Sequence, residues 1–230
     1  MSKTDGRVVL ITGARGGLGS FVTERFLETG AIVIGTSRSI TQSDFSHPKF
    51  TAMPTDFFKG TAVSELTNRV VARFGKIDVL AHVLGGFAGG QPIADTDDKI
   101  WGQMLDKNLT ATFYILRAVI PHMRKAKYGR IVAVGSLAAA EPHAGIGAYV
   151  ASKVGVAALV RTAALENADA NITANVVLPG TMDTPANRAA MPNADFSRWV
   201  QPSEVAKLIL MLASEEGAQI SNTLIPIEGY

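Results

Sequence analysis

Short apolar runs alternate along the chain with longer segments in which apolar residues recur at helical spacing. Most of the short runs are apolar without interruption, as in parallel strands that helices cover on both faces. The predicted strands are Val8–Thr12, Ile32–Thr36, Phe50–Pro54, Val79–Leu84, Gly129–Gly135, Asn171–Leu178 and Thr223–Ile227. The predicted helices are Gly17–Thr29, Thr61–Phe74, Asp97–Lys125, Tyr149–Glu166 and Ser203–Ser214. The pattern predicts an α/β fold with one doubly wound parallel β-sheet and helices on both of its faces.

The least regular stretch lies between Gly180 and Pro202, where three prolines and few apolar pairs predict a surface loop. No repeat, low-complexity tract or linker divides the sequence. We therefore expect one domain over residues 1–230, in which residues 183–202 form a lid over the substrate. Open parallel sheets bind ligands beyond the carboxyl ends of their strands, and the motifs described below fall at those ends.

The composition excludes several classes of protein. The chain of 230 residues carries a formal net charge of +2, too small to favour nucleic acid or an anionic membrane as a partner. Cysteine is absent, which removes disulfides, thiolate metal sites and cysteine nucleophiles. The four histidines have no ligand spacing, so we expect no metal. Without a signal-like first segment or an apolar stretch approaching ~20 residues, the sequence predicts a cytoplasmic protein that acts on a small molecule.

A glycine-rich segment directly follows the first predicted strand and opens the first predicted helix. It reads Thr12-Gly13-Ala14-Arg15-Gly16-Gly17-Leu18-Gly19. Glycines allow a tight turn and a close approach of phosphate to the backbone, and the helix N-terminus adds N–H donors and partial positive charge. The segment predicts a site for a dinucleotide pyrophosphate; the alternative is a turn that binds no nucleotide.

The end of the second predicted strand bears on the choice of cofactor. It reads Gly35-Thr36-Ser37-Arg38 and lacks the acidic residue that would accept hydrogen bonds from a ribose diol. Arg38 instead offers a forked donor set suited to a phosphate, and Arg15 in the glycine turn adds a second cation. This pattern favours NADP(H) over NAD(H), the alternative being two ordinary surface charges.

A candidate catalytic pair opens the fourth predicted helix. Tyr149 and Lys153 are four residues apart, so both side chains face the same way, and a nearby ammonium lowers the pKa of a phenol toward working pH. Ser136 ends the preceding strand, where its hydroxyl can bond a substrate oxygen. Asn108 lies within a predicted helix, where holding a water would account for an amide. Each of the four has a structural alternative, and their joint occurrence favours chemistry.

In this combination the sequence resembles the short-chain dehydrogenases/reductases over essentially its whole length. The matching segments are the glycine turn, Asp56, Asn108, Ser136, Tyr149-Val-Ala-Ser-Lys153 and Pro179-Gly180-Thr181. The resemblance implies a Rossmann-type sheet, a nicotinamide cofactor and a catalytic tetrad of Asn108, Ser136, Tyr149 and Lys153. It implies cofactor contacts at Gly13, Arg15, Gly16, Gly17, Leu18, Gly19, Ser37, Arg38, Asp56, Leu84, Gly85, Tyr149, Lys153, Pro179, Gly180 and Thr181.

The chain departs from that family at the end of the fourth predicted strand. The family usually shows Asn-Asn-Ala-Gly there, whereas this sequence has His82-Val83-Leu84-Gly85. Main-chain contacts to the adenosine survive such a change, but the amide side chains that brace the centre of the sheet do not. His82 is interpreted as a packed residue at the strand end, with a catalytic base as the alternative.

Two loops, residues 85–90 and 183–199, resemble the corresponding segments of quinonoid dihydropteridine reductase, a member of the same family that favours NADH and lacks the family serine. The present chain keeps Ser136 and Arg38, so the likeness concerns the loops. It implies a flat pocket in which Phe87, Phe196 and Trp199 stack on the substrate; the alternative is that these rings tie down a short lid.

We predict an NADPH-dependent oxidoreductase that transfers a hydride between the nicotinamide and a small carbonyl or alcohol substrate, with Tyr149 as acid/base. The alternatives are reduction of a quinonoid dihydropterin and a nucleotide-sensing homologue without catalysis. The predicted helix Tyr149–Glu166 is apolar around most of its circumference. One of its faces is therefore expected to meet a second subunit, in a homo-oligomer that is a tetramer or a dimer.

Overall fold

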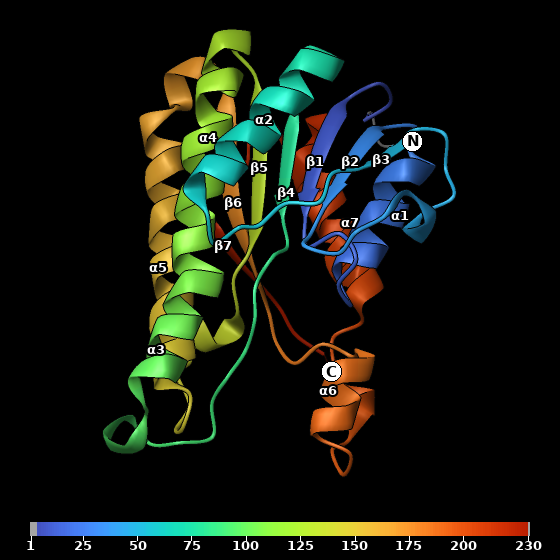
Figure 1. The fold of residues 1–230 in the computed structure, drawn as a ribbon. Helices are drawn as coiled ribbons and strands as arrows, with labels where there is room; N and C mark the ends of the chain where they lie inside the picture. Colours follow the sequence, from blue (N-terminus) through green and yellow to red (C-terminus); the bar gives the residue numbers. More distant parts are fainter. Residues whose placement is uncertain (1–3, 230) are drawn as a thin grey trace.

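The computed structural model describes residues 4–229 and contains one seven-stranded parallel sheet. Its strands run in the order β3-β2-β1-β4-β5-β6-β7 (Figure 1). They are β1 (Val8–Thr12), β2 (Ile32–Thr36), β3 (Phe50–Ala52), β4 (Val79–His82), β5 (Gly129–Val134), β6 (Ile172–Pro179) and β7 (Leu224–Ile227). The predicted fold class is confirmed, and each predicted strand is present within a few residues of its predicted ends.

Helices cover both faces of the sheet. They are α1 (Gly19–Glu28), α2 (Gly60–Phe74), α3 (Asp98–Met104), α4 (Ala111–Ala126), α5 (Gly147–Glu166), α6 (Pro185–Ala190) and α7 (Pro202–Ala213). One apolar core lies between the sheet and α2, α4 and α5, and a second lies between the sheet and α1 and α7 (Figure 1).

Strand β1 shows why its sequence is apolar without alternation. Successive strand side chains point to opposite faces, so Val8 and Leu10 enter the first core while Val9 and Ile11 enter the second. All four are at most 1% exposed. Burial on both faces removes any position where a polar side chain would reach water, and the strand therefore reads as a continuous apolar run.

Two predicted boundaries were wrong. The predicted helix Asp97–Lys125 is divided by a π-helical turn, Leu105–Thr110, into α3 and α4. The predicted loop between Gly180 and Pro202 contains α6, which begins with Pro185 in the first turn and is capped by the side chain of Thr184. In both places the cause is a specific side-chain contact, which periodicity does not report.

The sheet reverses its strand order at β1, which pairs with β2 on one side and β4 on the other. The connections after β1 and β4 therefore leave the sheet toward opposite faces, and the carboxyl ends of these strands open into a crevice. The glycine turn and the residues after β4 and β5 all lie at that edge.

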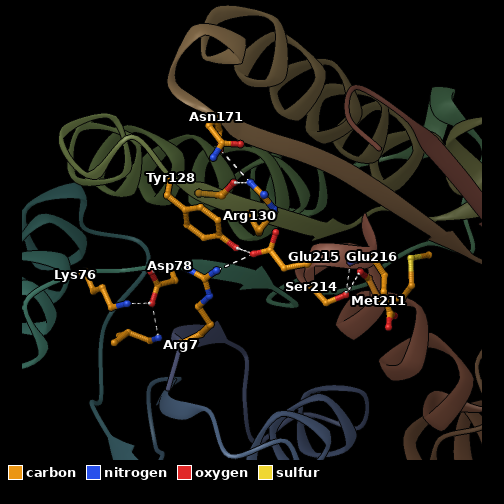
Figure 2. A network of polar contacts seen from close by, with 12 residues as sticks. Arg7, Lys76, Asp78, Tyr128, Arg130, Asn171, Met211, Ser214, Glu215 and Glu216 are labelled. Atoms are coloured by element: carbon orange, nitrogen blue, oxygen red, sulfur yellow. Dashed lines mark hydrogen bonds and ion pairs between the residues drawn. The ribbon is translucent and has the colours of Figure 1, made fainter. Parts of the chain in front are cut away.

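The opposite edge of the sheet, where the strands begin, carries a separate polar network (Figure 2). The carboxylate of Asp78 accepts from the N–H of Val8 and pairs with Lys76, both at 2.8 Å. The ring of Tyr128 lies between the guanidinium groups of Arg7 and Arg130, 4.1 and 4.4 Å from its centroid. Burial raises the pKa of the Tyr128 phenol. The network joins the amino ends of β1, β4 and β5 and lies away from the crevice.

Among the helices of residues 4–229, α5 alone is long and apolar enough to cross a membrane. A helix of a packed core passes the same test. Lys153 in the middle of α5 is buried and bonds to β5, as in a helix that packs on a sheet.

Candidate active site

The turn after β1 places main-chain N–H groups at the start of α1. Gly13 has φ +70°, and its N–H donates to the carbonyl oxygen of Thr36 at 2.8 Å. A Cβ at Gly13 would lie 3.0 Å from the Cα of Leu84, and one at Gly19 would collide with the carbonyl oxygen of Gly13. Only glycine fits these two positions, and the resulting turn leaves a helix N-terminus free to meet a phosphate.

The other predicted residues of the turn occupy different environments. Gly17 faces Thr184 of the lid, whose Cγ2 would lie 3.1 Å from a Cβ at Gly17. The side chain of Leu18 is 5% exposed and belongs to the core beneath α1, so only its main chain can contact a cofactor. The main-chain N–H of Gly16 donates to Gly13, which tightens the turn.

The end of β2 fits the predicted dinucleotide. The hydroxyl oxygens of Thr36 and Ser37 are buried and have no hydrogen-bond partner in the structure. Such groups rarely remain unpaired in a folded protein unless a ligand or water satisfies them. Arg38, which follows them, is exposed, and within residues 4–229 no carboxylate lies within ion-pair distance of its guanidinium. Unpaired hydroxyls beside an unpaired guanidinium are suited to a ribose phosphate.

Arg15 differs from Arg38 in having a partner. Its Nε lies 3.1 Å from a carboxylate oxygen of Asp44, and its Nη1 donates to the hydroxyl of Ser39 at 3.2 Å. Its cation is therefore partly neutralised. Asp56 lies in the turn before α2, where its carboxylate accepts from the N–H of Phe58 at 3.1 Å. The ring of Phe58 lies 5.7 Å from the Arg38 guanidinium, so Asp56 belongs to the same end of the crevice.

Lys153 is buried at the carboxyl end of β5. Its Nζ donates to the carbonyl oxygen of Val134 at 2.9 Å. The same Nζ would lie 3.1 Å from a Cβ at Gly85, so a side chain at residue 85 would crowd the ammonium. Burial lowers the pKa of Lys153 to about 8.

Tyr149 lies one turn before Lys153 on α5, and the Lys153 Nζ is 6.0 Å from the centroid of its ring. Burial raises the pKa of the Tyr149 phenol, and a hydrogen bond with Ser136 acts in the opposite direction. The lysine was expected to lower this pKa. In this structure burial has the larger effect, and Ser136 is the group that favours the phenolate.

The remaining predicted tetrad residue, Asn108, lies in the π-helical turn and is 1% exposed. Its side-chain oxygen accepts from the N–H of Gly86 at 2.9 Å, and its amide nitrogen donates to the carbonyl oxygen of Gly86 at 3.1 Å. The amide also donates to the hydroxyl of Ser152 at 3.0 Å. π-Helical turns often occur at functional sites, and this one turns an amide toward the loop after β4.

Sequence reasoning missed the role of Ser152. This residue is fully buried, and its hydroxyl donates to the carbonyl oxygen of Tyr149 at 2.7 Å while accepting from Asn108. It therefore links the amide of the π-helical turn to the helical turn that carries the phenol. Its place between Tyr149 and Lys153 gave no separate signal, because a serine in a helix usually faces solvent.

His82 is buried, with both ring nitrogens engaged. Nδ1 lies 2.7 Å from the hydroxyl of Thr12, and Nε2 lies 3.0 Å from the hydroxyl of Thr112. Burial, with a smaller effect of the nearby Lys153 charge, lowers the pKa of His82 to about 3. The imidazole is thus packed and has no free nitrogen for a substrate. It braces β1 against α4, so the centre of the sheet does not lack a polar brace.

Pro179 ends β6, Gly180 and Thr181 lead on into the lid, and the Gly180 N–H donates to the carbonyl oxygen of Ile227 at 3.0 Å. Thr184, which sequence reasoning did not single out, is buried and contacts the glycine turn. It therefore joins the lid to the predicted cofactor site.

The three predicted substrate aromatics are not together. The Phe87 ring lies edge-on to Tyr149, with centroids 5.0 Å apart. Phe196 and Trp199 instead pack against each other within the lid at 4.7 Å, and Arg188 lies over Phe196. A recess at the start of α5 is lined in part by Ala88, Gly89, Ile100 and Ile146. Residues 4–229 contain no cluster of three His, Asp or Glu side chains that could hold a metal ion.

Comparison with known sequences places this arrangement in a family. A family model described as short chain dehydrogenase matches residues 7–195. The chain is 31% identical to the 3-oxoacyl-[acyl-carrier-protein] reductase FabG of Thermotoga maritima, over 99% of this chain and 98% of the relative. It is 30% identical to the short-chain dehydrogenase/reductase cdmF of Talaromyces verruculosus, over 96% of this chain and 95% of that protein.

Solved structures of similar proteins superpose closely on this fold. The crystal structure of gox2181 superposes with a TM-score of 0.90 at 27% identity, covering 97% of this chain and 94% of that one. A short-chain type dehydrogenase/reductase from Mycobacterium ulcerans superposes with a TM-score of 0.93 at 24% identity, covering 99% of this chain and 90% of that one, and shows the same fold.

Proposed function

The chain belongs to the short-chain dehydrogenase family of NAD(P)-dependent oxidoreductases, and we propose that it is an NADPH-dependent reductase of small carbonyl compounds. One observation carries the proposal. The Tyr149 phenol, the Ser136 hydroxyl and the buried Lys153 ammonium converge beside a glycine turn at the carboxyl edge of the sheet. This is the arrangement that proton transfer to a bound carbonyl oxygen requires.

In this proposal the cofactor lies along the crevice from β2 to β6. The glycine turn, including Gly16, Gly17 and the main chain of Leu18, holds the pyrophosphate. Ser37 and Arg38 hold the 2′-phosphate, which is why NADP(H) is preferred over NAD(H). Asp56, Leu84 and Gly85 line the adenosine end, and Pro179, Gly180 and Thr181 line the nicotinamide end. The nicotinamide, when bound, supplies the hydride.

Tyr149 acts as the acid. Burial raises its pKa, so the phenol keeps its proton at neutral pH and can donate it from Oη to the carbonyl oxygen of the substrate. In this structure the Ser136 hydroxyl bonds the Tyr149 phenol, and its oxygen accepts from the N–H of Ala138 at 3.2 Å. In this proposal the hydroxyl turns its proton to the same carbonyl when the substrate binds.

Lys153 and Asn108 support that step. The Lys153 ammonium is fixed between Val134 and Gly85 and binds the nicotinamide ribose through its remaining N–H groups. Asn108 uses its side chain to hold Gly86 against the site. In this arrangement the amide is occupied by protein groups, so any water that relays a proton would be held by the main chain of the π-helical turn.

The proposal also includes the extent of the domain, its lid and an oligomer of several subunits. One domain over residues 1–230 would carry the site, with residues 183–202 as its lid. The outer face of α5 exposes Ala151, Val154, Ala158 and Leu165, which share one side of the helix. We assign this face to a subunit interface in a dimer or tetramer.

The substrate experiment compares two chemistries. The reductases named among the relatives make a β-ketoacyl ester the first carbonyl to test, and the edge-on Phe87 and Tyr149 rings make a quinonoid dihydropterin the second. Initial rates of NADPH oxidation are measured side by side, with wild type and with Ser136→Ala. Faster reduction of the ester, lost in Ser136→Ala, supports the carbonyl reductase. Faster reduction of the pterin, with little effect of Ser136→Ala, supports the alternative. Tight NADPH binding without turnover of either would favour a nucleotide sensor.

A further inference from the structure

His82 belongs to a string of hydrogen bonds that crosses the crevice beneath the site. The Leu84 N–H donates to the Thr12 hydroxyl oxygen at 3.2 Å, and that hydroxyl bonds His82 Nδ1 at 2.7 Å. On the other side, His82 Nε2 bonds the Thr112 hydroxyl at 3.0 Å, and that hydroxyl donates to the main-chain oxygen of Asn108 at 2.6 Å. The string joins the two segments that flank Lys153, the loop after β4 and the π-helical turn.

The direction of every bond in the string follows from its two ends. Thr112 gives its single proton to the Asn108 carbonyl, so it can only accept from the ring, and Nε2 must carry the hydrogen. A neutral imidazole then has an acceptor at Nδ1, to which the Thr12 hydroxyl donates. No polar atom of Thr12, His82 or Thr112 is left unpaired.

The charge of the ring matters because Lys153 is its neighbour. A protonated imidazole would place a second buried cation close to the ammonium, and it would also turn Nδ1 from an acceptor into a donor. The neutral ring is compatible with both the lysine and the string. Lys153 is the charged group that acts on His82 in this structure.

We propose that His82, as the neutral Nε2–H tautomer, is a positioning residue that fixes the π-helical turn through Thr112 and the loop after β4 through Thr12. Its effect reaches Tyr149 through Asn108 and Ser152, which bonds the Tyr149 carbonyl. The effect on turnover rests on the reductase function proposed above; the tautomer and the bonds do not.

Substitution of Thr112 tests the positioning role most directly. Thr112→Val keeps the shape of the side chain and removes both the donor to Asn108 and the acceptor of His82. It is expected to lower kcat for the β-ketoacyl ester about tenfold or more, because two buried hydrogen bonds are lost. The dissociation constant for NADPH is expected to stay within about twofold of wild type. Thr112→Ser keeps the hydroxyl and is expected to restore kcat to within about threefold.

A matched control is Thr67→Val on α2. Thr67 is also a buried helical threonine, and its hydroxyl donates to the main-chain oxygen of Ser64 at 3.0 Å, far from the string. A loss of stability without a change in kcat is expected there. Equal effects of Thr67→Val and Thr112→Val on kcat would overturn the positioning role.

A second pair of variants tests the ring itself. His82→Asn keeps one donor and one acceptor and is expected to retain more of kcat than His82→Leu, which takes one hydrogen-bond partner away from each of two buried hydroxyls. Equal kcat in these two folded variants would overturn the proposal.

Two measurements need no turnover. Long-range proton–nitrogen NMR of histidine-labelled wild type, with His82→Asn to assign the signal, is expected to show a neutral Nε2–H ring from about pH 5 to about pH 8. The opposite tautomer, or titration in that range, would contradict the proposed directions of these hydrogen bonds.

If no substrate is turned over, NMR titration of ζ-labelled tyrosine decides the positioning role. The Tyr149 pKa is expected to move by about half a unit or more in Thr112→Val and not in Thr67→Val. An unmoved Tyr149 in both would overturn it.

Discussion

The ring of Phe87 stands edge-on to the ring of Tyr149, with centroids 5.0 Å apart and planes inclined by 75°. Phe87 is 65% exposed and lies in the segment Gly85-Gly86-Phe87-Ala88-Gly89-Gly90, whose other side chains are small, so its side chain is held mainly by this one contact. The contact involves the faces and edges of the two rings and leaves the phenol hydroxyl free. The hydroxyl can therefore be removed without disturbing the pair.

Replacing Tyr149 by phenylalanine is expected to reduce kcat at least about 1000-fold, because the proton donor is lost while the ring contact with Phe87 remains. Fluorescence titration should show the dissociation constant for NADPH within about threefold of wild type. Tyr114→Phe, the same change on α4, serves as the control and should leave both quantities unchanged. Wild-type turnover in Tyr149→Phe would exclude the proposed acid.

The raised pKa of Tyr149 predicts different pH profiles for the two directions of reaction. The phenol stays protonated below its ordinary value of 10.0, so the reductive kcat should be flat with respect to this group from about pH 6 to about pH 9. Alcohol oxidation requires the phenolate and should become faster as the pH rises through the same range. Initial rates in both directions test this, and an oxidative rate that falls with rising pH would contradict it.

Arg38→Ala is expected to weaken NADPH binding about 10- to 100-fold, because a charge-assisted bond to the 2′-phosphate is lost. NADH lacks that phosphate, so its dissociation constant should change less than about twofold. Arg25→Ala on α1 removes a partly exposed guanidinium that pairs with Glu28 and is the matched control. Equal weakening of NADPH and NADH binding by Arg38→Ala would show that this guanidinium does not bind the 2′-phosphate.

His82 predicts a component of acid stability. Its folded-state pKa of about 3 lies below the ordinary value of 6.5, so the unfolded chain binds a proton between those values that the folded protein does not. The resulting stability is complete above about pH 6.5 and is lost as the pH falls toward 3, at up to about 1.4 kcal/mol per pH unit.

The measurement is urea unfolding of wild type and His82→Asn at several pH values. The other three histidines are common to both proteins, so the difference between the curves isolates residue 82. Parallel curves over this range would mean that the imidazole is not buried in its neutral form.

The exposed ridge of α5 predicts self-association. Leu165 is 68% exposed and Val154 is 46% exposed, and a second copy of the same face would cover both. Light scattering should give a multiple of the chain mass, and Val154→Arg should lower it. Phe21→Arg, at an exposed apolar residue of α1, should not. A monomer mass for the wild type would reject the interface.

The sequence predicted the features that depend on residue spacing within a single helix or strand. Apolar runs located the strands, most clearly at the centre of the sheet, where burial on both faces leaves few polar positions. The helical spacing of Tyr149 and Lys153 predicts that both side chains face the same way, and in the structure the Lys153 Nζ lies 6.0 Å from the centroid of the Tyr149 ring. The order of the strands was not predicted from the sequence and comes from the structure.

The sequence could not predict contacts between distant residues. The predicted helix Asp97–Lys125 breaks because Asn108 bonds Gly86 and Ser152, 22 and 44 residues away. The imidazole of His82 finds Thr12 and Thr112, 70 and 30 residues away, and so supplies the brace expected to be missing. Periodicity describes neighbours along one element, and these bonds join different elements.

The strand order also determines which strand edges stay unpaired while the chain is being synthesised. Strand β1 can pair with β2 soon after synthesis, but its other neighbour, β4, begins only at Val79. Until then, a nascent chain carries Val8–Thr12 as an apolar strand with an open edge, the kind of surface on which chains aggregate. The His82 bond to Thr12 forms in the same event that closes this edge. The nascent chain therefore loses the open edge of β1 and gains the polar brace beneath the crevice in one step.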